Sequence, residues 1–420
     1  MAVAVVVGAL ITAAAVTKGF PAADLRLNDG SVWVTNGTSR LVGKFNAQID
    51  ELSVGVPMVN SDFDILQNGD NLVTVDNQSR LLQQLDSGRA SLGTPALLPP
   101  KARVSLGRAT VAVTNPANGS TFFGDLGAIL GVDLVKGKPD LQLGPGGVST
   151  VTSNGNGIGL SVDTDELVRI GADGKPTTVK VPFDVQAGTA ELAAVGEKAV
   201  VLDRAQGRLW VEGGKPVSVP DAASAQLQAP SVQPFQSAHG QVSALVATLH
   251  GLYGVVGGKL AELSPGITGT PIQPVVVAGC GYGAFLSGTS GEVAVACDGK
   301  GGVPFIREAI PSLSRNNALT FRVNRDVVVL NDAVGGNIWL PNQNMKLIAG
   351  WEKVAPPKPK RGDSDNTATT ELIDPNRSGP NRPPVALDDT LRARAGASTI
   401  LPLMDNDSDP NGDIITVTSE

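Results

Sequence analysis

The sequence has few aromatic residues, two cysteines and two histidines. Phe, Trp and Tyr make up 4 % of the 420 residues, so a core must be filled largely by Val, Ala and other small or β-branched side chains. The histidines, His239 and His250, lie in a different repeat from Cys280 and Cys297, and no C-x-x-C pair occurs. These counts and positions argue against a structural zinc site.

Familiar catalytic motifs are also absent from the sequence. It has no G-x-S-x-G, no H-E-x-x-H, no G-x-x-x-x-G-K-[ST] and no G-x-G-x-x-G in a strand–helix setting. Acidic residues are spread among predicted turns rather than paired, which does not indicate a two-carboxylate hydrolase. An excess of basic charge is lacking too. A net charge of −7 and a pI near 5.0 argue against non-specific binding to nucleic acid.

The chain does contain a repeated strand–turn–strand unit. The clearest copy, residues 199–219, reads AVVLDRAQGRLWVEGGKPVSV, in which three short apolar runs are separated by turns. In most copies an apolar strand ends on a short polar residue whose side chain suits a turn: Asn36, Asp76, Asn115, Asp163, Asp203, Asp298 and Asn331. Spacings of 40, 39, 48 and 40 residues separate the first five of these positions.

This spacing matches the roughly 40–50 residues of a four-stranded propeller blade. It predicts an all-β fold, a β-propeller of about eight blades over residues 20–354, and seven blades also fit the pattern. Residues 24–27 are predicted to form a strand that precedes the first repeat. One such unit alone would expose both edges and most of a face, so we expect the blades to be stable only in a closed ring.

The first segment, residues 1–19, is predicted to be a signal-anchor or a cleaved signal. Its apolar run, AVAVVVGALITAAAV, would form a short apolar helix, and it is shorter than the roughly 20 residues that span a bilayer. No Lys or Arg precedes it, so the usual basic flank of a secretory signal is missing. A buried strand or core helix is the third interpretation. The signal-anchor predicts a single-pass protein of the cell membrane with most of the chain outside the cell.

The cysteines are predicted to form a disulfide. Cys280 and Cys297 lie in two apparent neighbouring strands of one blade, and a hairpin could place them opposite each other. Export favours such a bond. The alternative is a pair of buried free thiols in a cytosolic protein.

Two copies of the repeat carry a tryptophan at a similar place. D-R-A-Q-G-R-L-W ends at Trp210 and N-D-A-V-G-G-N-I-W ends at Trp339. These phrases resemble the units of quinoprotein-type and other eight-bladed propellers, in which Trp and Gly dock neighbouring blades. The resemblance implies blade packing and no particular cofactor. Trp33, in the middle of a predicted strand, is expected to pack between blades rather than to line a ligand pocket.

The pattern changes at the C-terminus. Residues 355–382 are rich in proline and predict an exposed linker. The following stretch, NRPPVALDDTLRARAGASTILPLMDNDSDPNGDIITV, resembles the start of the tandem cadherin-like or immunoglobulin-like repeats of bacterial surface proteins. Residues 383–420 are therefore expected to begin a β-sandwich module that the chain does not complete, since such a domain needs about 100 residues.

The chain as a whole resembles large actinobacterial envelope proteins with a propeller followed by tandem modules of the immunoglobulin or fibronectin type III kind. This resemblance implies placement at the cell surface. Oxygen ligands at alternate positions of the last segment also fit a calcium site between modules, at Asp405, Asp407, Asp409 and Asp413. The other interpretation is a turn in which these side chains bind their own backbone.

The function expected from the sequence is non-catalytic binding or scaffolding in the cell envelope. Loops of the propeller would present a binding surface for a protein or a cell-wall glycan, and the N-terminal segment would anchor the chain in the membrane. Nucleic acid is not an expected partner. No catalytic or cofactor-binding residue is nominated. The alternatives are a propeller-class enzyme, quinone-dependent or glycan-acting, and the ectodomain of a signalling protein.

Overall fold

The computed structural model describes residues 30–171, 175–230, 232–298, 305–355 and 383–386. The chain divides into two units, Met1–Pro356 and Pro357–Glu420, and residues 383–386 are the described part of the second. The expectations for residues 1–19, for the strand at 24–27, for most of the linker and for the calcium ligands Asp405, Asp407, Asp409 and Asp413 lie outside the described residues. No helix in the described ranges is long and apolar enough to cross a membrane.

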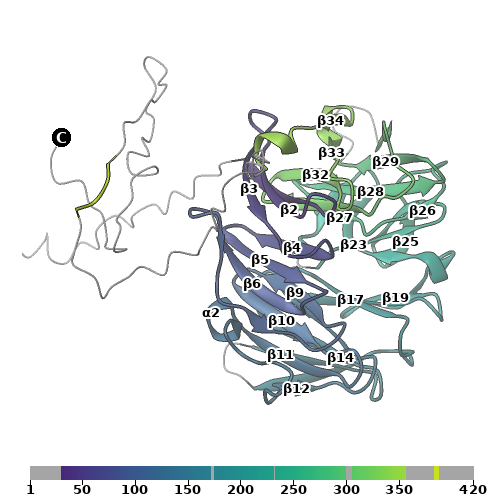
Figure 1. Cartoon of the computed structure of the whole chain (residues 1–420). Helices are drawn as coiled ribbons and strands as arrows, with labels where there is room; N and C mark the ends of the chain where they lie inside the picture. The colour runs from purple at the N-terminus through teal and green to yellow at the C-terminus, as the bar shows by residue number, and fades with distance from the viewer. Residues whose placement is uncertain (1–29, 172–174, 231, 299–304, 356–382, 387–420) are drawn as a thin grey trace, which may run out of the picture. The chain divides into compact units, whose positions relative to one another are not determined.

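The first unit is an all-β propeller of eight antiparallel sheets, which confirms the predicted fold class (Figure 1). The first four sheets contain these strands: β1 (Ser31–Asn36), β2 (Leu41–Asn46) and β3 (Glu51–Pro57); β4 (Phe63–Asn68), β5 (Asn71–Asp76), β6 (Leu81–Asp86), β7 (Ser91–Leu92) and β8 (Ala96–Leu97); β9 (Arg103–Gly107), β10 (Thr110–Thr114), β11 (Ser120–Asp125) and β12 (Leu141–Gln142); β13 (Val148–Val151), β14 (Gly157–Ser161), β15 (Glu166–Ile170) and β16 (Pro176–Lys180). One short helix, α2 (Leu126–Ile129), follows β11.

The last four sheets complete the ring. They contain β17 (Ala190–Val195), β18 (Lys198–Asp203), β19 (Arg208–Val211) and β20 (Val217–Ser218); β21 (Gln226–Leu227), β22 (Phe235–Ser237), β23 (Gly240–Thr248), β24 (Gly251–Val256) and β25 (Lys259–Glu262); β26 (Thr270–Pro271), β27 (Val275–Val277), β28 (Cys280–Ser287), β29 (Ser290–Ala296) and β30 (Phe305–Ala309); β31 (Leu319–Asn324), β32 (Val327–Asp332), β33 (Ile338–Leu340) and β34 (Lys346–Ile348). Single 3-10 turns lie at Ala222–Ser224, Pro341–Gln343 and Trp351–Lys353.

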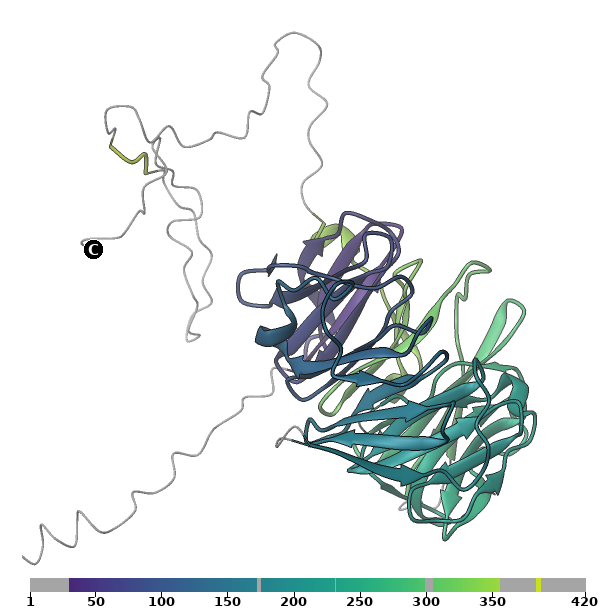
Figure 2. The ribbon, with the colours of Figure 1, turned by 90° about the horizontal axis from the view of Figure 1, so that it is seen from below.

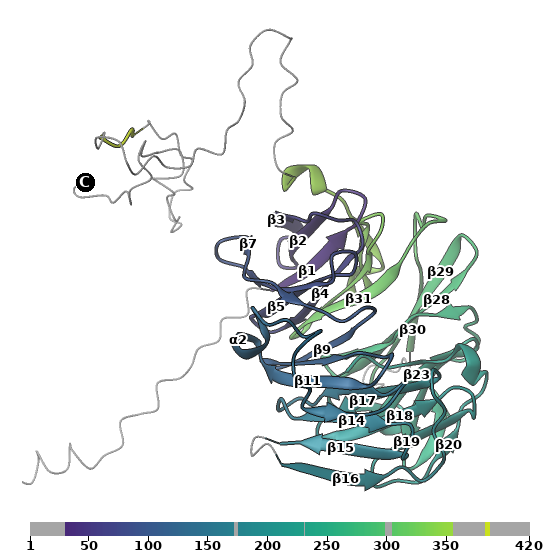
Figure 3. The ribbon, with the colours of Figure 1, turned by 60° about the horizontal axis from the view of Figure 1, so that its bottom comes forward.

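The core lies between the sheets. Seven hydrophobic clusters each join two neighbouring sheets, and most of their members are Val, Ala, Leu and Ile. Figure 3 shows sheets three to five following one another along the ring. Trp210 and Trp339 lie in two of these clusters, the first between sheets four and five and the second between sheets seven and eight. Each sheet therefore buries its faces against its neighbours, as the repeats predicted.

The ring closes where the first and last sheets meet. Val32 and Val34 of the first sheet share a buried cluster with Val329 and Ile338 of the eighth. Figure 2 shows these two sheets side by side, purple against green. Strand β1 corresponds to β5, the second strand of the second sheet. One edge of β1 pairs with β2, as one edge of β5 pairs with β6, and the other edge of β1 faces the neighbouring sheets.

Side chains from both neighbouring sheets bind the backbone along this edge of β1. The Asn331 amide accepts a hydrogen bond from Thr35 N at 2.9 Å and donates one to Thr35 O at 3.0 Å, the two bonds that a paired strand residue would make. Trp33 N donates to Gln67 Oε1 at 3.0 Å. Asn324 Nδ2 donates to Ser31 O at 2.8 Å. The edge is thus hydrogen-bonded across the junction between the ends of the ring.

The short polar residues at strand ends act as the sequence predicted in several sheets. Asn36 Oδ1 accepts a hydrogen bond from Ser39 N at 2.9 Å, Asp76 Oδ1 accepts one from Ser79 N at 2.8 Å, and Asp203 Oδ1 accepts one from Ala205 N at 2.9 Å. Such bonds fix the turns that follow β1, β5 and β18.

Two positions of the repeat differ from the prediction. Asp298 follows β29, the third strand of its sheet, so that copy was aligned one strand too far along. Strand β32 extends to Asp332, and Asp332 Oδ1, not Asn331, accepts the turn hydrogen bond from Val334 N at 3.1 Å. Strands of similar apolar content cannot be told apart by pattern alone, which explains the first difference.

The predicted disulfide is present. Cys280 begins β28 and Cys297 directly follows β29, and the two Cα atoms are 4.4 Å apart. The adjacent residues Gly281 and Ala296 pair across the two strands. A loop of this length, once closed, stabilises the fold by about 3 kcal/mol.

Candidate functional site

A central cavity of about 530 Å³ lies where the inner strands of the ring converge. All eight sheets contribute to its wall. The second sheet gives Asp64 to Asn68 of β4, and the sixth gives Gln226 to Pro230, which begins at β21. The first sheet gives Trp33 of β1. Trp33 is 2 % exposed and packs in the core between sheets one and two, so it supports the wall more than it opens to the cavity, in line with the sequence prediction.

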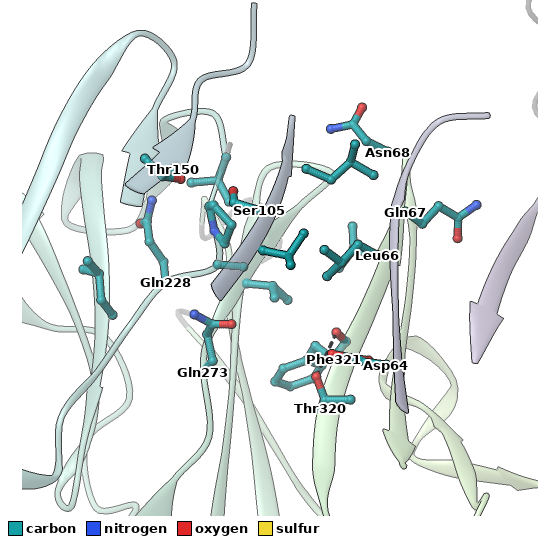
Figure 4. Close-up of a pocket in the computed structure, with 18 of the residues that line it drawn as sticks. Asp64, Leu66, Gln67, Asn68, Ser105, Thr150, Gln228, Gln273, Thr320 and Phe321 are labelled. Carbon is teal, nitrogen blue, oxygen red and sulfur yellow. Dashed lines mark hydrogen bonds between the residues drawn. The ribbon is translucent and has the colours of Figure 1, made fainter. Parts of the chain in front are cut away.

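Amide and hydroxyl side chains dominate the polar part of the wall (Figure 4). They come from six different sheets and include Gln67, Asn68, Ser105, Ser149, Thr150, Gln226, Gln228, Gln273 and Thr320. Apolar residues such as Leu66 and Phe321 fill the spaces between them. The cavity has the size of an ordinary small-molecule site and the mixed lining such sites have.

A second cavity of about 970 Å³ adjoins the first. The two share Gln67, Asn68, Val232, Val276 and Val323. The turns that connect the first and second strands of several sheets surround the second cavity, and there Arg325 Nη2 lies 3.0 Å from Asp70 Oδ1. The second cavity therefore lies on the side of the propeller where these turns are.

Most charged groups in the wall of the central cavity have partners within the protein. Arg322 is buried, and its Nη1 lies 2.6 Å from Asp64 Oδ1 and 3.0 Å from Ile65 O. Glu191 Oε2 accepts a hydrogen bond from Leu227 N at 2.8 Å, and its Oε1 lies 3.4 Å from Arg204 Nε. The Arg103 side chain is solvent-exposed at the cavity wall. Within the described residues, no group of three or more His, Cys, Asp or Glu side chains could hold a metal ion.

Glu191 is the titratable group of the cavity with a shifted pKa. Burial raises the pKa of the Glu191 carboxyl above its usual 4.5, against the opposing influence of the Leu227 N–H and of Arg204 and Arg103. The folded state therefore holds this proton more tightly than the unfolded chain. The resulting stability is fully present below pH 4.5 and is lost as the pH rises through the raised pKa.

Replacing Glu191 by Gln is accordingly expected to flatten the decline of stability above pH 4.5, because glutamine keeps an acceptor for Leu227 N without the buried charge. Urea unfolding at a series of pH values from 4 to 8 measures this slope, with the exposed Glu352→Gln as the control. Equal slopes for the wild type and Glu191→Gln would show that this carboxyl does not titrate differently in the folded state.

Sequence reasoning did not find this cavity. Each sheet contributes a small number of common residues, and apart from Trp33 these lie on or beside the inner strands, outside the apolar runs that defined the repeats. One feature is shared: Gln67, Ser105, Thr150 and Glu191 each lie on the strand that precedes the second strand of its sheet. Their positions along these strands differ, since Gln67 pairs with Leu72, Ser105 with Ala112, Thr150 with Ile158 and Glu191 with Leu202, so an alignment would not have placed them in one column.

The two histidines lie outside both cavities. His250 Nδ1 is 2.5 Å from Asp221 Oδ2 on the surface, and His239 is in an exposed turn.

No protein-family model matches the chain, and no curated protein matches its sequence. Solved structures do resemble it. Dihydro-heme d1 dehydrogenase NirN in complex with DHE is similar at 10 % identity with a TM-score of 0.50, over 76 % of this chain and 72 % of that one. AztD from Citrobacter koseri is similar at 13 % identity with a TM-score of 0.48, over 76 % and 94 % of the two chains.

A third similar structure is the virginiamycin B lyase from Staphylococcus aureus, at 11 % identity with a TM-score of 0.41, over 74 % of this chain and 90 % of that one. Two of these three proteins are named as enzymes and one is not. At such low identities the likeness concerns the fold and does not extend to the activity.

Proposed function

We propose that this chain is a non-catalytic binding and scaffold protein of the cell envelope, and that its propeller holds a protein or glycan ligand at the central cavity. The observation that carries the proposal is the cavity itself, about 530 Å³ in volume, walled by all eight sheets and rich in amides and hydroxyls. Such groups recognise a ligand through hydrogen bonds, and their convergence from many strands gives a rigid, preformed site.

The pairing of charges supports binding rather than chemistry at this site. Asp64 is held by Arg322, and the Glu191 carboxyl is held by Leu227 N and Arg204. These contacts hold each carboxylate in place, which leaves it less free to act as a nucleophile on a ligand. In this proposal these charged groups fasten the inner strands to one another, and the neutral side chains meet the ligand.

Placement in the envelope is the second part of the proposal. The disulfide between Cys280 and Cys297 is typical of an oxidising compartment. The apolar run at residues 1–19 would anchor the chain in the membrane, and the segment from residue 383 would begin tandem modules that carry calcium at Asp405, Asp407, Asp409 and Asp413. The propeller would then stand outside the cell as the ligand-binding head.

The proposal is tested by blocking the cavity. Gln273 is exposed and points into the cavity in Figure 4, so Gln273→Trp fills this space without disturbing the core. The 420-residue chain is applied to an array of neutral and acidic oligosaccharides and to a second array of 15-residue peptides. We expect a signal on at least one array, reduced about 100-fold or more by Gln273→Trp.

The control is Gln84→Trp, which adds the same ring at an exposed position of β6 outside both cavities. It is expected to bind as the wild type does. Silence on both arrays, or a signal that Gln273→Trp leaves unchanged, would contradict the proposal.

A further inference from the structure

Three buried polar atoms of residues that line the central cavity lack a hydrogen-bond partner in the described part of the chain. They are Ser105 Oγ, Thr150 Oγ1 and Gln228 Nε2. Thr150 is 1 % exposed, Gln228 2 % and Ser105 7 %. Leaving a buried donor or acceptor unpaired costs about 1–3 kcal/mol, so three of them around one cavity need an explanation.

The orientation of the Gln228 amide is set by its surroundings. Its Oε1 accepts a hydrogen bond from Leu245 N at 2.7 Å, and a backbone N–H requires an oxygen there. Gln228 N in turn donates to Leu245 O at 3.1 Å. The backbone and the side chain of Gln228 are therefore both bonded to Leu245 of β23. The amide nitrogen is therefore left with two N–H donors. In Figure 4 it points toward Thr150.

The two hydroxyls belong to neighbouring sheets. Ser105 lies on β9 and Thr150 on β13, and these two strands contact each other. Other hydroxyls at the same junction are satisfied: Thr114 Oγ1 lies 3.0 Å from Thr121 Oγ1 and 2.5 Å from Ser149 Oγ. The free capacity is thus confined to the groups at the cavity wall and is not general at this junction.

The chemistry of these three groups specifies the kind of ligand. Gln228 offers two N–H donors, while each hydroxyl can donate one hydrogen bond and accept two. Once these side chains turn toward the cavity, a ligand hydroxyl can pair with each of them, because it too donates and accepts hydrogen bonds. Arg103 and Arg204 offset the charge of the Glu191 carboxyl, and Asp64 and Arg322 are neutralised by each other, so the charges of the wall favour neither an anion nor a cation.

We propose that Ser105, Thr150 and Gln228 form a subsite for a neutral polyhydroxylated ligand, a sugar residue of an oligosaccharide. This proposal rests on the proposed function and narrows its ligand to one class. The subsite spans the third, fourth and sixth sheets, so it exists only in the assembled ring. It gives these buried polar atoms the partners that the protein does not supply.

Calorimetric titration of the 420-residue chain tests the subsite. The probes are maltotetraose, cellotetraose, mannotetraose and galactotetraose, with trigalacturonic acid as the acidic counterpart and tetra-alanine as the amide counterpart. We expect at least one neutral tetrasaccharide to bind. Gln228→Leu, Thr150→Val and Ser105→Ala are each expected to weaken its binding about 10- to 100-fold, because a ligand hydroxyl then loses its partner.

A second measurement separates recognition from structure. Thr150→Val removes a hydroxyl that the protein leaves unpaired, so its thermal stability is expected to equal or exceed that of the wild type while binding falls. The matched control is Thr121→Val, which removes a buried hydroxyl outside both cavities that is already paired with Thr114 and with Gly119 O. It is expected to lose stability and to retain the wild-type affinity.

The outcomes distinguish this proposal from the broader one. Neutral sugars that bind the three variants as tightly as they bind the wild type would overturn the subsite. Variants that lose stability without losing affinity would also overturn it, because that result would mean that the three atoms bind structural water. If only the peptide or the acidic sugar binds, and Gln273→Trp abolishes that binding, the subsite is wrong and the proposed function stands. If none of the probes or arrays gives binding, both fail.

Discussion

Replacing Asn331 by Ala is expected to lower the free energy of unfolding by about 2–6 kcal/mol, because it leaves two buried backbone groups of Thr35 unpaired at about 1–3 kcal/mol each. Asn331 and Thr35 are fully buried. The Asn331 side-chain amide accepts a hydrogen bond from Thr35 N at 2.9 Å and donates one to Thr35 O at 3.0 Å. Thr35 Oγ1 also donates to Asn331 Oδ1 at 3.1 Å. Urea unfolding measures the change.

The position of these bonds explains why the loss is large. Asn331 and Thr35 are 296 residues apart in the sequence, so their hydrogen bonds join the two ends of the ring. Arg322 reinforces the junction, since its Nη2 donates to Thr35 Oγ1 at 3.1 Å and its Nη1 donates to Ile65 O. Alanine at position 331 would therefore weaken a network that holds the eighth, first and second sheets together.

Asn115→Ala is the matched control, because Asn115 is an asparagine at a strand end whose Oδ1 accepts one turn hydrogen bond, from Ala117 N at 3.1 Å. Its loss is expected to cost about 1 kcal/mol, as for other local side-chain caps. Equal effects of Asn331→Ala and Asn115→Ala would mean that Asn331 is an ordinary turn residue and that the junction does not depend on it.

Replacing Trp339 by Ala is expected to destabilise the propeller by about 3–5 kcal/mol through the cavity that it leaves. Trp339 is 0 % exposed and lies in the cluster shared by sheets seven and eight, among Val293, Leu330 and Met345. Its indole Nε1 donates to Pro311 O at 2.9 Å, which would lose its partner as well. The same urea experiment measures this variant.

Trp339→Phe serves as the control, since it keeps an aromatic ring in the cluster and removes the indole N–H. We expect it to cost about 1–2 kcal/mol, clearly less than the alanine variant. A loss below 1 kcal/mol for Trp339→Ala would show that sheets seven and eight do not depend on this contact.

The sequence allowed the fold class, the eightfold repeat, the disulfide and the role of several turn residues to be predicted. These features depend on short-range patterns: alternating apolar residues, a polar residue at the strand end as at Asp76 and Asp203, and two cysteines in adjacent strands. The packing of Trp210 and Trp339 between neighbouring sheets follows from the same repeats.

The cavity and the closure of the ring could not be predicted in this way. Gln228 and Thr150 become neighbours of one cavity only when separate inner strands converge, and nothing in the residues around either one indicates a site. Asn331 was predicted to serve the turn that follows its strand, but its amide crosses to β1. A hydrogen bond between residues far apart in the sequence leaves no pattern in the residues around either of them.

The claim on which the fold and the cavity both depend is that the eighth sheet is joined to the first. Hydrogen–deuterium exchange at the Thr35 amide, in the wild type and in Asn331→Ala, tests it most directly. We expect the wild-type amide to be as protected as that of Val201 in the middle of β18, and Asn331→Ala to lose that protection while Val201 retains more of it. Rapid exchange of the Thr35 amide in the wild type, beside a protected Val201, would contradict the closed ring.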